Sequence, residues 1–327
     1  MVFYTRFSQL TYLKIKYMEN TKYAGSERNF IKLSDNKFNE GRNVCVGLDI
    51  DYGKIPELLQ ISDHFQKKEP MLRFNKKIID ATHDLVHAYK PNSAFYEQYG
   101  VGGMEVLEST IDYIHKVAPD VPVILDAKRA DIDNTNLGYI KSAFDHLKAD
   151  AITVHPYLGS EAMKPFLDMK NKGIIVLCRT SNKGAGQIQD RKVLVTHAEC
   201  TKYDYFGDGE FDSDLAMAVY LYKYIAAVVK IDWNYNNNCL LVVGATSPEE
   251  LKQIHAITPN IPKLIPGVGA QGGKVSDVVP IFKNTNGHGM IINSSRGIIY
   301  ASAGEDFAEV ARAEVIKLQN EINLYLQ

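Results

Sequence analysis

The chain has 327 residues, of which 45% are hydrophobic and 23% charged, and its formal net charge is −2. This near-neutral balance gives no overall reason to expect nucleic acid or an acidic membrane surface as a partner. No apolar run is long enough to span a bilayer, because the nearest candidate, 215–231, is broken by Lys223 and Lys230. The four cysteines are widely spaced without a CxxC pair, which favours buried reduced thiols and a cytoplasmic location.

Residues 1–42 are polar and aromatic without clear periodicity, and they predict an N-terminal extension ahead of a catalytic domain over 43–327. In that domain, short apolar runs alternate with helix-like patterns. The runs are mostly apolar rather than alternating, as expected for strands covered on both faces. The predicted strands are 44–49, 90–96, 121–126, 151–155, 173–179, 240–244, 263–266 and 290–293. The predicted helices are 72–89, 103–117, 135–148, 160–172, 212–231, 247–257, 274–282 and 304–326.

Eight βα units in series predict an α/β fold of the (β/α)8 TIM barrel type. A doubly wound open sheet is the alternative, but a nucleotide-binding sheet of that kind normally has a Gly-rich turn after its first strand. The turn from Gly47 to Asp51 lacks that fingerprint, so the barrel is favoured. Two irregular segments, 52–69 and 180–212, interrupt the pattern, and the length of the second is typical of a lid or a binding loop.

The most distinctive pattern is a lysine between two carboxylates where the third predicted strand ends. The period of two in a strand directs Asp126 and Lys128 to the same face, and Asp131 follows in the loop. Carboxylates hold a neighbouring lysine protonated, which suits a proton donor and not a Schiff-base nucleophile. A metal on Asp126 and Asp131 is disfavoured because Lys128 would repel it. Taken alone, the cluster is either a structural ion network or a catalytic one.

Two loops at the ends of the seventh and eighth predicted strands carry the pattern of a phosphate site. The first begins at Pro266 and is rich in glycine, including Gly269, and the second contains Ser295 and Arg296. Glycines expose backbone N–H groups, and barrels often bind phosphate between these two loops. Arg296 would add a permanently charged clamp.

The run 126–135, Asp-Ala-Lys-Arg-Ala-Asp-Ile-Asp-Asn-Thr, closely resembles the signature of the orotidine 5′-phosphate decarboxylase family. Blocks at 46–49, 90–96, 179–182, 266–271 and 293–297 resemble the family's other signatures, in the same order. Arg129 and the segment 96–99 resemble a branch found in many bacteria and apicomplexan parasites. Asp133 stands where that branch generally has glycine, so the start of the following helix is expected to differ slightly.

The resemblance implies a role for each matching residue. Asp49 and Lys90, with Asn92, would bind the ribose; Asp126, Lys128 and Asp131 would surround the C6 carboxylate; Thr180 and Ser181 would read the pyrimidine edge; Gln271, Ser295 and Arg296, near Pro266 and Gly269, would hold the phosphate. It also implies a homodimer with shared active sites, in which Asp131 and Thr135 reach into the neighbouring subunit's site. The implied reaction converts orotidine 5′-phosphate (OMP) to UMP and CO2, with Lys128 donating a proton to C6. No cofactor motif offers an electron sink, so no cofactor and no metal are expected.

Two other functions compete with this interpretation. A sugar-phosphate decarboxylase or hexulose-phosphate synthase of the same barrel superfamily would use a similar Asp-x-Lys-x-x-Asp cluster together with magnesium. The blocks that contain Ser181 and Gln271 favour a pyrimidine nucleotide instead. A non-catalytic protein that binds pyrimidine nucleotides is the second alternative, and the intact set of charged residues argues against it.

Overall fold

The computed structural model describes residues 28–60, 67–203, 211–213, 216–269 and 271–327. Eight parallel strands form one sheet in the order β2-β1-β11-β10-β9-β5-β4-β3. They are β1 (Val44–Gly47), β2 (Ala88–Lys90), β3 (Ile124–Arg129), β4 (Ala151–Val154), β5 (Gly173–Arg179), β9 (Cys239–Val243), β10 (Lys263–Pro266) and β11 (Met290–Ser294). Isolated bridges from Tyr89 to Val123 and from Asn92 to Asp126 join the two edge strands. The predicted TIM barrel is therefore confirmed.

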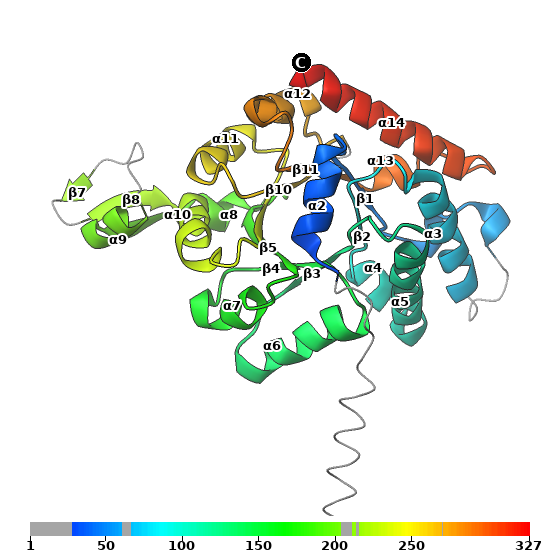
Figure 1. Ribbon diagram of the computed structural model, residues 1–327, viewed down its shortest axis with the longest axis horizontal. Helices are drawn as coiled ribbons and strands as arrows, with labels where there is room; N and C mark the ends of the chain where they lie inside the picture. Colours follow the sequence, from blue (N-terminus) through cyan, green and yellow to red (C-terminus); the bar gives the residue numbers. More distant parts are fainter. Residues whose placement is uncertain (1–27, 61–66, 204–210, 214–215, 270) are drawn as a thin grey trace, which may run out of the picture.

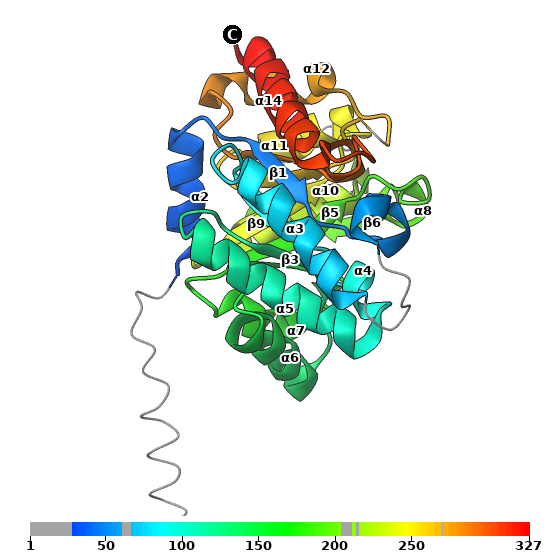
Figure 2. The same ribbon diagram turned by 90° about the vertical axis from the view of Figure 1, so that its right-hand side faces the viewer.

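Helices surround this barrel on its outside (Figure 1). The α-helices are α2 (Phe30–Asn39), α3 (Lys68–Thr82), α4 (Ala94–Glu97), α5 (Gly100–Val117), α6 (Asp133–Ile140), α7 (Gly159–Leu167), α8 (Gly186–Gln189), α9 (His197–Lys202), α10 (Leu221–Val228), α11 (Pro248–Ile257), α12 (Val275–Val278), α13 (Arg296–Ile299) and α14 (Phe307–Leu326). Shorter 3-10 turns lie at Tyr52–Lys54, Glu57–Leu59 and Val279–Thr285, and π-helical turns follow α6 (Lys141–His146) and α10 (Val229–Trp233). Helix α3 packs between α5 and α14 (Figure 2).

Towards the N-terminal ends of the strands, the barrel interior is filled by an apolar layer to which every barrel strand contributes. Its members are Cys45, Ala88, Ile124, Ala151, Ile175, Leu240, Val242, Leu264 and Ile291. Helix α2 closes this end, and its fully buried Phe30 belongs to the same cluster. The domain boundary after residue 42 stays a prediction, but α2, on its N-terminal side, packs against the barrel.

Two predicted elements are wrong. The second strand was expected over 90–96, but β2 ends at Lys90 and 94–97 form the single helical turn α4. The apolar Ala-Phe-Tyr run is helical because the Asn92 side chain accepts a hydrogen bond from the Ala94 N–H and the Ser93 carbonyl accepts one from Tyr96. The helix expected over 212–231 begins only at Leu221, and the segments 211–213 and 216–220 ahead of it form strands.

The expected long loop over 180–212 is largely folded. It contains α8, β6 (Lys192–Thr196), α9 and β7 (Phe211–Ser213), and β6 pairs antiparallel with β8 (Ala216–Tyr220), which also pairs with β7. A capping box between Thr196 and Glu199 starts α9. Figure 1 shows this small sheet and α9 projecting from the barrel. Part of the predicted lid, 204–210, lies outside the described residues.

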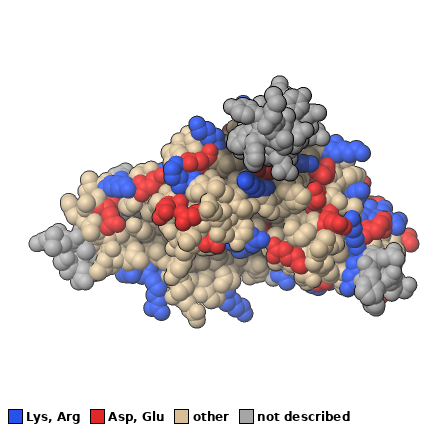
Figure 3. All heavy atoms as spheres, turned by 90° about the horizontal axis from the view of Figure 1, so that it is seen from below, with Lys and Arg blue, Asp and Glu red and all other residues tan. Residues whose placement is uncertain are grey.

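The face seen in Figure 3 has no large area of one charge, because acidic and basic side chains are scattered among uncharged ones. All four cysteines are free and buried, as expected. Among the helices that the structure describes, none combines the length and the apolar character needed to span a membrane.

Candidate active site

A polar layer lies directly above the apolar one, at the C-terminal ends of the strands. Lys90, Asp126, Thr153 and Asn293 each follow a member of the apolar layer by two residues, so the strand period places them on the same inner side. The Lys90 ammonium lies 2.9 Å from Asp126 Oδ2, and the Thr153 hydroxyl donates to Asp126 Oδ1 at 2.9 Å. Lys90 and Asp126 are only 4% and 9% exposed. The barrel interior therefore holds a buried ion pair near the C-terminal ends of the strands.

Lys128 approaches the same carboxylate from the rim. Its ammonium lies 2.6 Å from Asp126 Oδ1, and its side chain is 48% exposed. The contact between Asp126 and Lys128 is as expected, but the regular pleat does not produce it. The pairing of β3 with β4 shifts register between Leu125 and Arg129, and Lys128 adopts a left-handed φ of 48°. A bulge in β3 turns the lysine over its own strand.

Electrostatics keep the buried pair charged. Burial alone would lower the pKa of Lys90, but the charges of Asp126 and Asp49 outweigh it, and the net effect is a raised pKa. Burial would raise the pKa of Asp126, but Lys90 and Lys128 hold the pKa of that carboxyl well below its usual range. Asp126 is thus a carboxylate held between two ammonium groups. The half-exposed Lys128 leaves a positive charge available to a ligand with developing negative charge.

Two buried oxygens near this cluster lack a hydrogen-bond partner among the described residues. They are Asp49 Oδ1, just beyond the end of β1, and Asn293 Oδ1 on β11. An unsatisfied buried acceptor is costly, so such atoms are suited to donors supplied by a ligand, such as hydroxyl groups. Asp49 was predicted as a site residue, whereas Asn293 and Thr153 were not. Strand alternation places both on the inner side of the barrel, but it does not show which groups they would contact there.

The loops after β5 and β10 lie against each other. At Gly267, in the loop after β10, an added Cβ would lie 3.1 Å from the Ser181 Cβ and 3.0 Å from Gln271 Oε1. A side chain at position 267 would meet both residues, so the glycine there allows Ser181 and Gln271 to lie close to the same point. Thr180 is held by Gln189, whose side-chain oxygen accepts from the Thr180 N–H at 2.8 Å.

The expected phosphate loops have the conformation that glycine allows. Gly267, Gly269 and Gly272 all have positive φ values, of 99°, 74° and 92°. In the second loop, Ser295 donates its hydroxyl hydrogen to the Gly47 carbonyl at 3.1 Å, which fixes this loop against β1. Arg296 is exposed and forms no ion pair with any residue that the structure describes. Its guanidinium is thus available to an anion.

Two predicted residues lie apart from the cluster of their own chain. Asp131 Oδ1 accepts from the Ile132 N–H at 2.7 Å, and no interaction among the described residues joins Asp131 to Lys128. Thr135 is exposed and lines a cavity of about 470 Å³ between β3, α5 and α6, outside the barrel. A second cavity, of about 510 Å³ beside β5, α7 and α10, also lies outside the charged cluster.

Comparison with known proteins places the chain in one family. Residues 42–313 match the family model described as orotidine 5′-phosphate decarboxylase / HUMPS family. The chain belongs to that family. It is 44% identical over 281 residues to the orotidine 5′-phosphate decarboxylase of Cellvibrio japonicus, covering 86% of this chain and 93% of that protein. The enzyme of the same name from Flavobacterium johnsoniae is 42% identical over 279 residues, covering 85% of this chain and 91% of that protein.

Solved structures of the family have the same fold. The chain matches the OMP decarboxylase of Leishmania donovani with a TM-score of 0.71 and 34% identity, covering 91% of this chain and 98% of that one. It matches the UMP synthase of the same organism with a TM-score of 0.73 and 35% identity, covering 91% of this chain but 57% of that one. The signature run that suggested the family occupies the bulged end of β3 and the start of α6.

Proposed function

We propose that the chain decarboxylates OMP to UMP and CO2, the last step of de novo pyrimidine nucleotide synthesis. The family membership supports the reaction, since the curated relatives reported above are named for it. The observation that carries the proposal is the buried carboxylate of Asp126 bound by Lys90 at 2.9 Å and by Lys128 at 2.6 Å. This arrangement puts a fixed cation at the rim, where Lys128 can meet an anionic centre.

In the proposed reaction, the bond between C6 and the carboxylate carbon breaks, CO2 leaves and the electron pair stays on C6. The Lys128 ammonium stabilises that charge and then transfers a proton to C6, which gives UMP. Asp126 keeps the ammonium in place through a charge-assisted hydrogen bond. Repulsion between Asp126 and the substrate carboxylate disappears as CO2 departs, although Lys90 neutralises part of it.

The remaining predicted residues bind the substrate in this proposal. The Asp49 carboxylate accepts hydrogen bonds from ribose hydroxyls, the Lys90 ammonium donates to them, and Asn92 assists. The unpaired buried Asp49 oxygen supports this role. Ser181 and Thr180 contact the pyrimidine edge. Gln271, Ser295 and Arg296 hold the phosphate beside Pro266 and Gly269. Binding energy from the phosphate and ribose positions C6 at Lys128.

The proposed reaction needs neither a metal nor an organic cofactor. Each oxygen of Asp126 already accepts a hydrogen bond from a lysine ammonium, and Thr153 occupies a further position on Oδ1. Two ammonium groups at these distances repel a divalent cation from the same carboxylate. This charge arrangement supports direct stabilisation of the carbanion by Lys128.

The test is the fall in ultraviolet absorbance as OMP becomes UMP, recorded with and without EDTA. We expect equal rates in both conditions. Loss of activity in EDTA would contradict the metal-free mechanism and favour a magnesium-dependent reaction on a sugar phosphate. No absorbance change in either condition, with UMP still bound, would favour a non-catalytic nucleotide-binding protein.

We also propose a homodimer in which Asp131 and Thr135 complete the partner's site. Both residues belong to the signature run, yet neither reaches the cluster of its own chain. The neighbouring surface carries exposed apolar side chains, with Ile132 57% and Leu137 47% exposed beside α6 and Tyr157 85% exposed after β4. Aromatic side chains such as Tyr157 are enriched at protein interfaces relative to the rest of the surface.

Mixed dimers test this sharing. When Lys128→Ala and Asp131→Ala chains are coexpressed with different tags, the mixed dimer has one site with both changes and one with neither. We expect about a quarter of wild-type activity in a random mixture, because about half of the dimers are mixed. A Lys128→Ala and Lys90→Ala mixture is the matched control, since both changes affect the same chain's cluster and every site stays damaged. Absence of activity in the first mixture would refute the shared site.

A cytoplasmic location and membership of the branch with Arg129 in its signature remain part of the proposal. The four buried, free cysteines support the first. The similarity to bacterial enzymes supports the second.

A further inference from the structure

The peptide that joins Ala127 to Lys128 is held from both ends by side chains. Its N–H, on Lys128, donates to the Thr153 hydroxyl at 2.9 Å. Its carbonyl, on Ala127, accepts from Arg129 Nη1 at 3.1 Å. Lys128 itself has a φ of 48°, a backbone conformation that residues other than glycine rarely adopt. A conformation of this kind persists only where surrounding contacts hold it.

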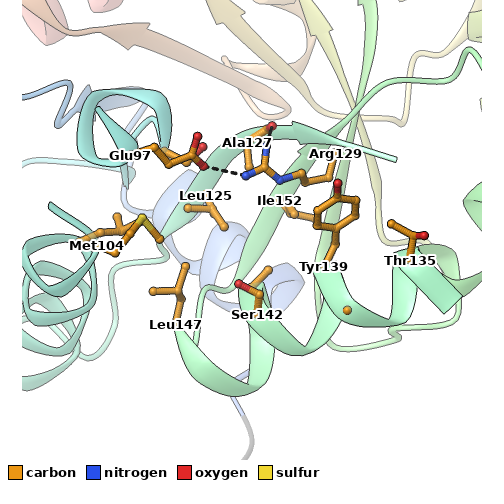
Figure 4. A pocket seen from close by; sticks show the side chains of 14 residues that line it. Glu97, Met104, Leu125, Ala127, Arg129, Thr135, Tyr139, Ser142, Leu147 and Ile152 are labelled. Atoms are coloured by element: carbon orange, nitrogen blue, oxygen red, sulfur yellow. Dashed lines mark hydrogen bonds and ion pairs between the residues drawn. The ribbon is translucent and has the colours of Figure 1, made fainter. Parts of the chain in front are cut away.

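Arg129 is itself held by two groups outside the barrel. Its Nη2 lies 2.7 Å from Glu97 Oε1, and its guanidinium lies 5.2 Å from the centre of the Tyr139 ring. Figure 4 shows Glu97 and Arg129 meeting at the edge of the cavity of about 470 Å³, with Tyr139 beside them. The arginine therefore lies between a carboxylate, an aromatic ring and a strand carbonyl, which restricts its movement.

Glu97 connects this contact to the second strand. It ends α4, the single turn that follows Lys90 and Asn92. The same segment reaches β3 through its backbone, because the Ser93 N–H donates to the Asp126 carbonyl at 3.2 Å. The segment that presents Lys90 is thus tied to β3 on both sides of the bulge, at Asp126 and at Arg129.

We propose that Arg129, anchored by Glu97, is a positioning residue that holds the strained Ala127–Lys128 peptide and so keeps the Lys128 ammonium over Asp126. The proposal rests on the assignment of Lys128 as the proton donor. The partners of Arg129 are the Ala127 carbonyl, Glu97 and Tyr139, and among the described residues no hydrogen bond or ion pair joins Arg129 to a residue predicted to bind the substrate. Its removal changes where Lys128 sits without removing any group that binds phosphate, ribose or pyrimidine.

The proposal predicts a split between turnover and binding. Arg129→Ala is expected to lower kcat by about 10- to 100-fold, since a displacement near 1 Å costs rates of this order, while the Kd for UMP changes by less than about threefold. Arg129→Lys retains part of kcat, because lysine can reach either Glu97 or the Ala127 carbonyl but not both. Glu97→Ala lowers kcat less than Arg129→Ala, and the double variant is no worse than Arg129→Ala alone.

A second arginine of the same chain provides the matched control. Arg312 binds Asp84 through both terminal nitrogens, at 2.6 and 2.8 Å, and donates to the Ala81 carbonyl at 2.7 Å, on α14 and far from the β3 bulge. Arg312→Ala is expected to leave kcat unchanged. UMP binding reports whether each variant is folded, and Glu97→Gln, a smaller change, serves if Arg129→Ala does not fold.

The outcomes are distinct. A kcat for Arg129→Ala within twofold of wild type overturns the proposal, as does a rise in KM at unchanged kcat or a multiplicative effect of the two alanine changes. Full activity in Lys128→Ala would instead refute the proton-donor assignment on which the proposal rests. Loss of kcat in Arg129→Ala and Lys128→Ala, with no further loss when the two are combined, supports both.

Discussion

Among the described lysines, Lys263 is the one whose replacement by an apolar residue we expect to stabilise the folded protein most. It begins β10 and is fully buried, and its ammonium donates to the Thr258 carbonyl. His255 on α11 also lies beside it, with its Nδ1 3.4 Å from the ammonium. No ion pair joins Lys263 to a carboxylate in the part of the chain that the structure describes. The charge is therefore desolvated without a counter-charge.

The size of the effect follows from the pKa of Lys263. Burial lowers the pKa of Lys263 from 10.5 to about 7, although Cys178 on β5 acts in the opposite direction. That difference corresponds to about 5 kcal/mol between the charged and neutral forms. Replacement by methionine removes this penalty and loses one hydrogen bond, worth about 1 kcal/mol, while the Thr258 carbonyl still accepts from the Ile261 N–H. We expect a net gain of about 3 to 4 kcal/mol at pH 7.

The sign of the pH dependence provides the sharper test. Because the folded pKa of Lys263 is lower than the unfolded one, the folded state binds fewer protons between pH 7 and 10.5. Wild-type stability therefore rises with pH over this window, by up to about 1.4 kcal/mol per pH unit, and Lys263→Met lacks that rise. Urea unfolding at pH 7, 8 and 9 measures the difference and avoids the titration of His255, whose pKa burial lowers to about 4.

The reasoning would be refuted if the free energy of unfolding of wild type and of Lys263→Met changed in parallel between pH 7 and 9. It would also be refuted if Lys263→Met were less stable than wild type at pH 7. Lys37 serves as the matched control, since it is 4% exposed but bonded to Glu40 at 3.0 Å and to Asp120 at 2.5 Å. Burial opposes its charge, but these partners raise its pKa. Lys37→Met is therefore expected to destabilise the protein.

Three further predictions concern the site and the ends of the strands. Lys128→Ala lowers kcat by about 10³-fold or more while the Kd for UMP stays within a few-fold, as single-turnover and titration measurements would record; near-normal kcat would contradict its role. Asp133→Gly raises stability by about 1 kcal/mol in urea unfolding, because Asp133 has a φ of 44°; an unchanged midpoint would show that the angle costs nothing. Arg28→Ala lowers stability by about 3 kcal/mol at pH 7, since it leaves the buried Asp150 carboxylate without the guanidinium 2.8 Å away. Burial opposes the Asp150 charge, but His115 and Arg28 lower the pKa of Asp150 to about 2. The stability that this ion pair contributes is therefore present above pH 4 and declines as pH falls towards 2. If wild type and Arg28→Ala lost stability with falling pH in the same way, the assignment would be refuted.

Local patterns in the sequence were sufficient to predict the barrel. Buried parallel strands are apolar throughout, and this signal located seven of the eight strands to within a few residues. The second strand failed because Ala94 to Tyr96 are apolar for a different reason, as a helical turn that packs Tyr96 into the core. The strand 216–220 was missed because its uninterrupted apolar run, Ala-Met-Ala-Val-Tyr, shows no alternation and leads directly into the helical pattern of α10.

The site could be predicted in composition but not in geometry. Strand period two places Asp126 inward, and the bulge that follows decides where Lys128 points. A bulge depends on contacts with β4 and α4, which are distant in sequence, so no local pattern reveals it. Thr153 was overlooked for a related reason, because a threonine in a strand is common and only its partners, Asp126 and the Lys128 N–H, give it a role.

Helix α2 also determines how the protein can be handled. It covers the N-terminal ends of the strands, where Phe30 and Phe38 join the lower apolar layer, whereas Lys90, Asp126 and Lys128 lie at the opposite ends. A purification tag or a surface tether joined ahead of Arg28 therefore enters beneath the barrel and leaves the substrate entrance open. Trimming the chain back to residue 43 would instead expose the apolar floor that this helix covers.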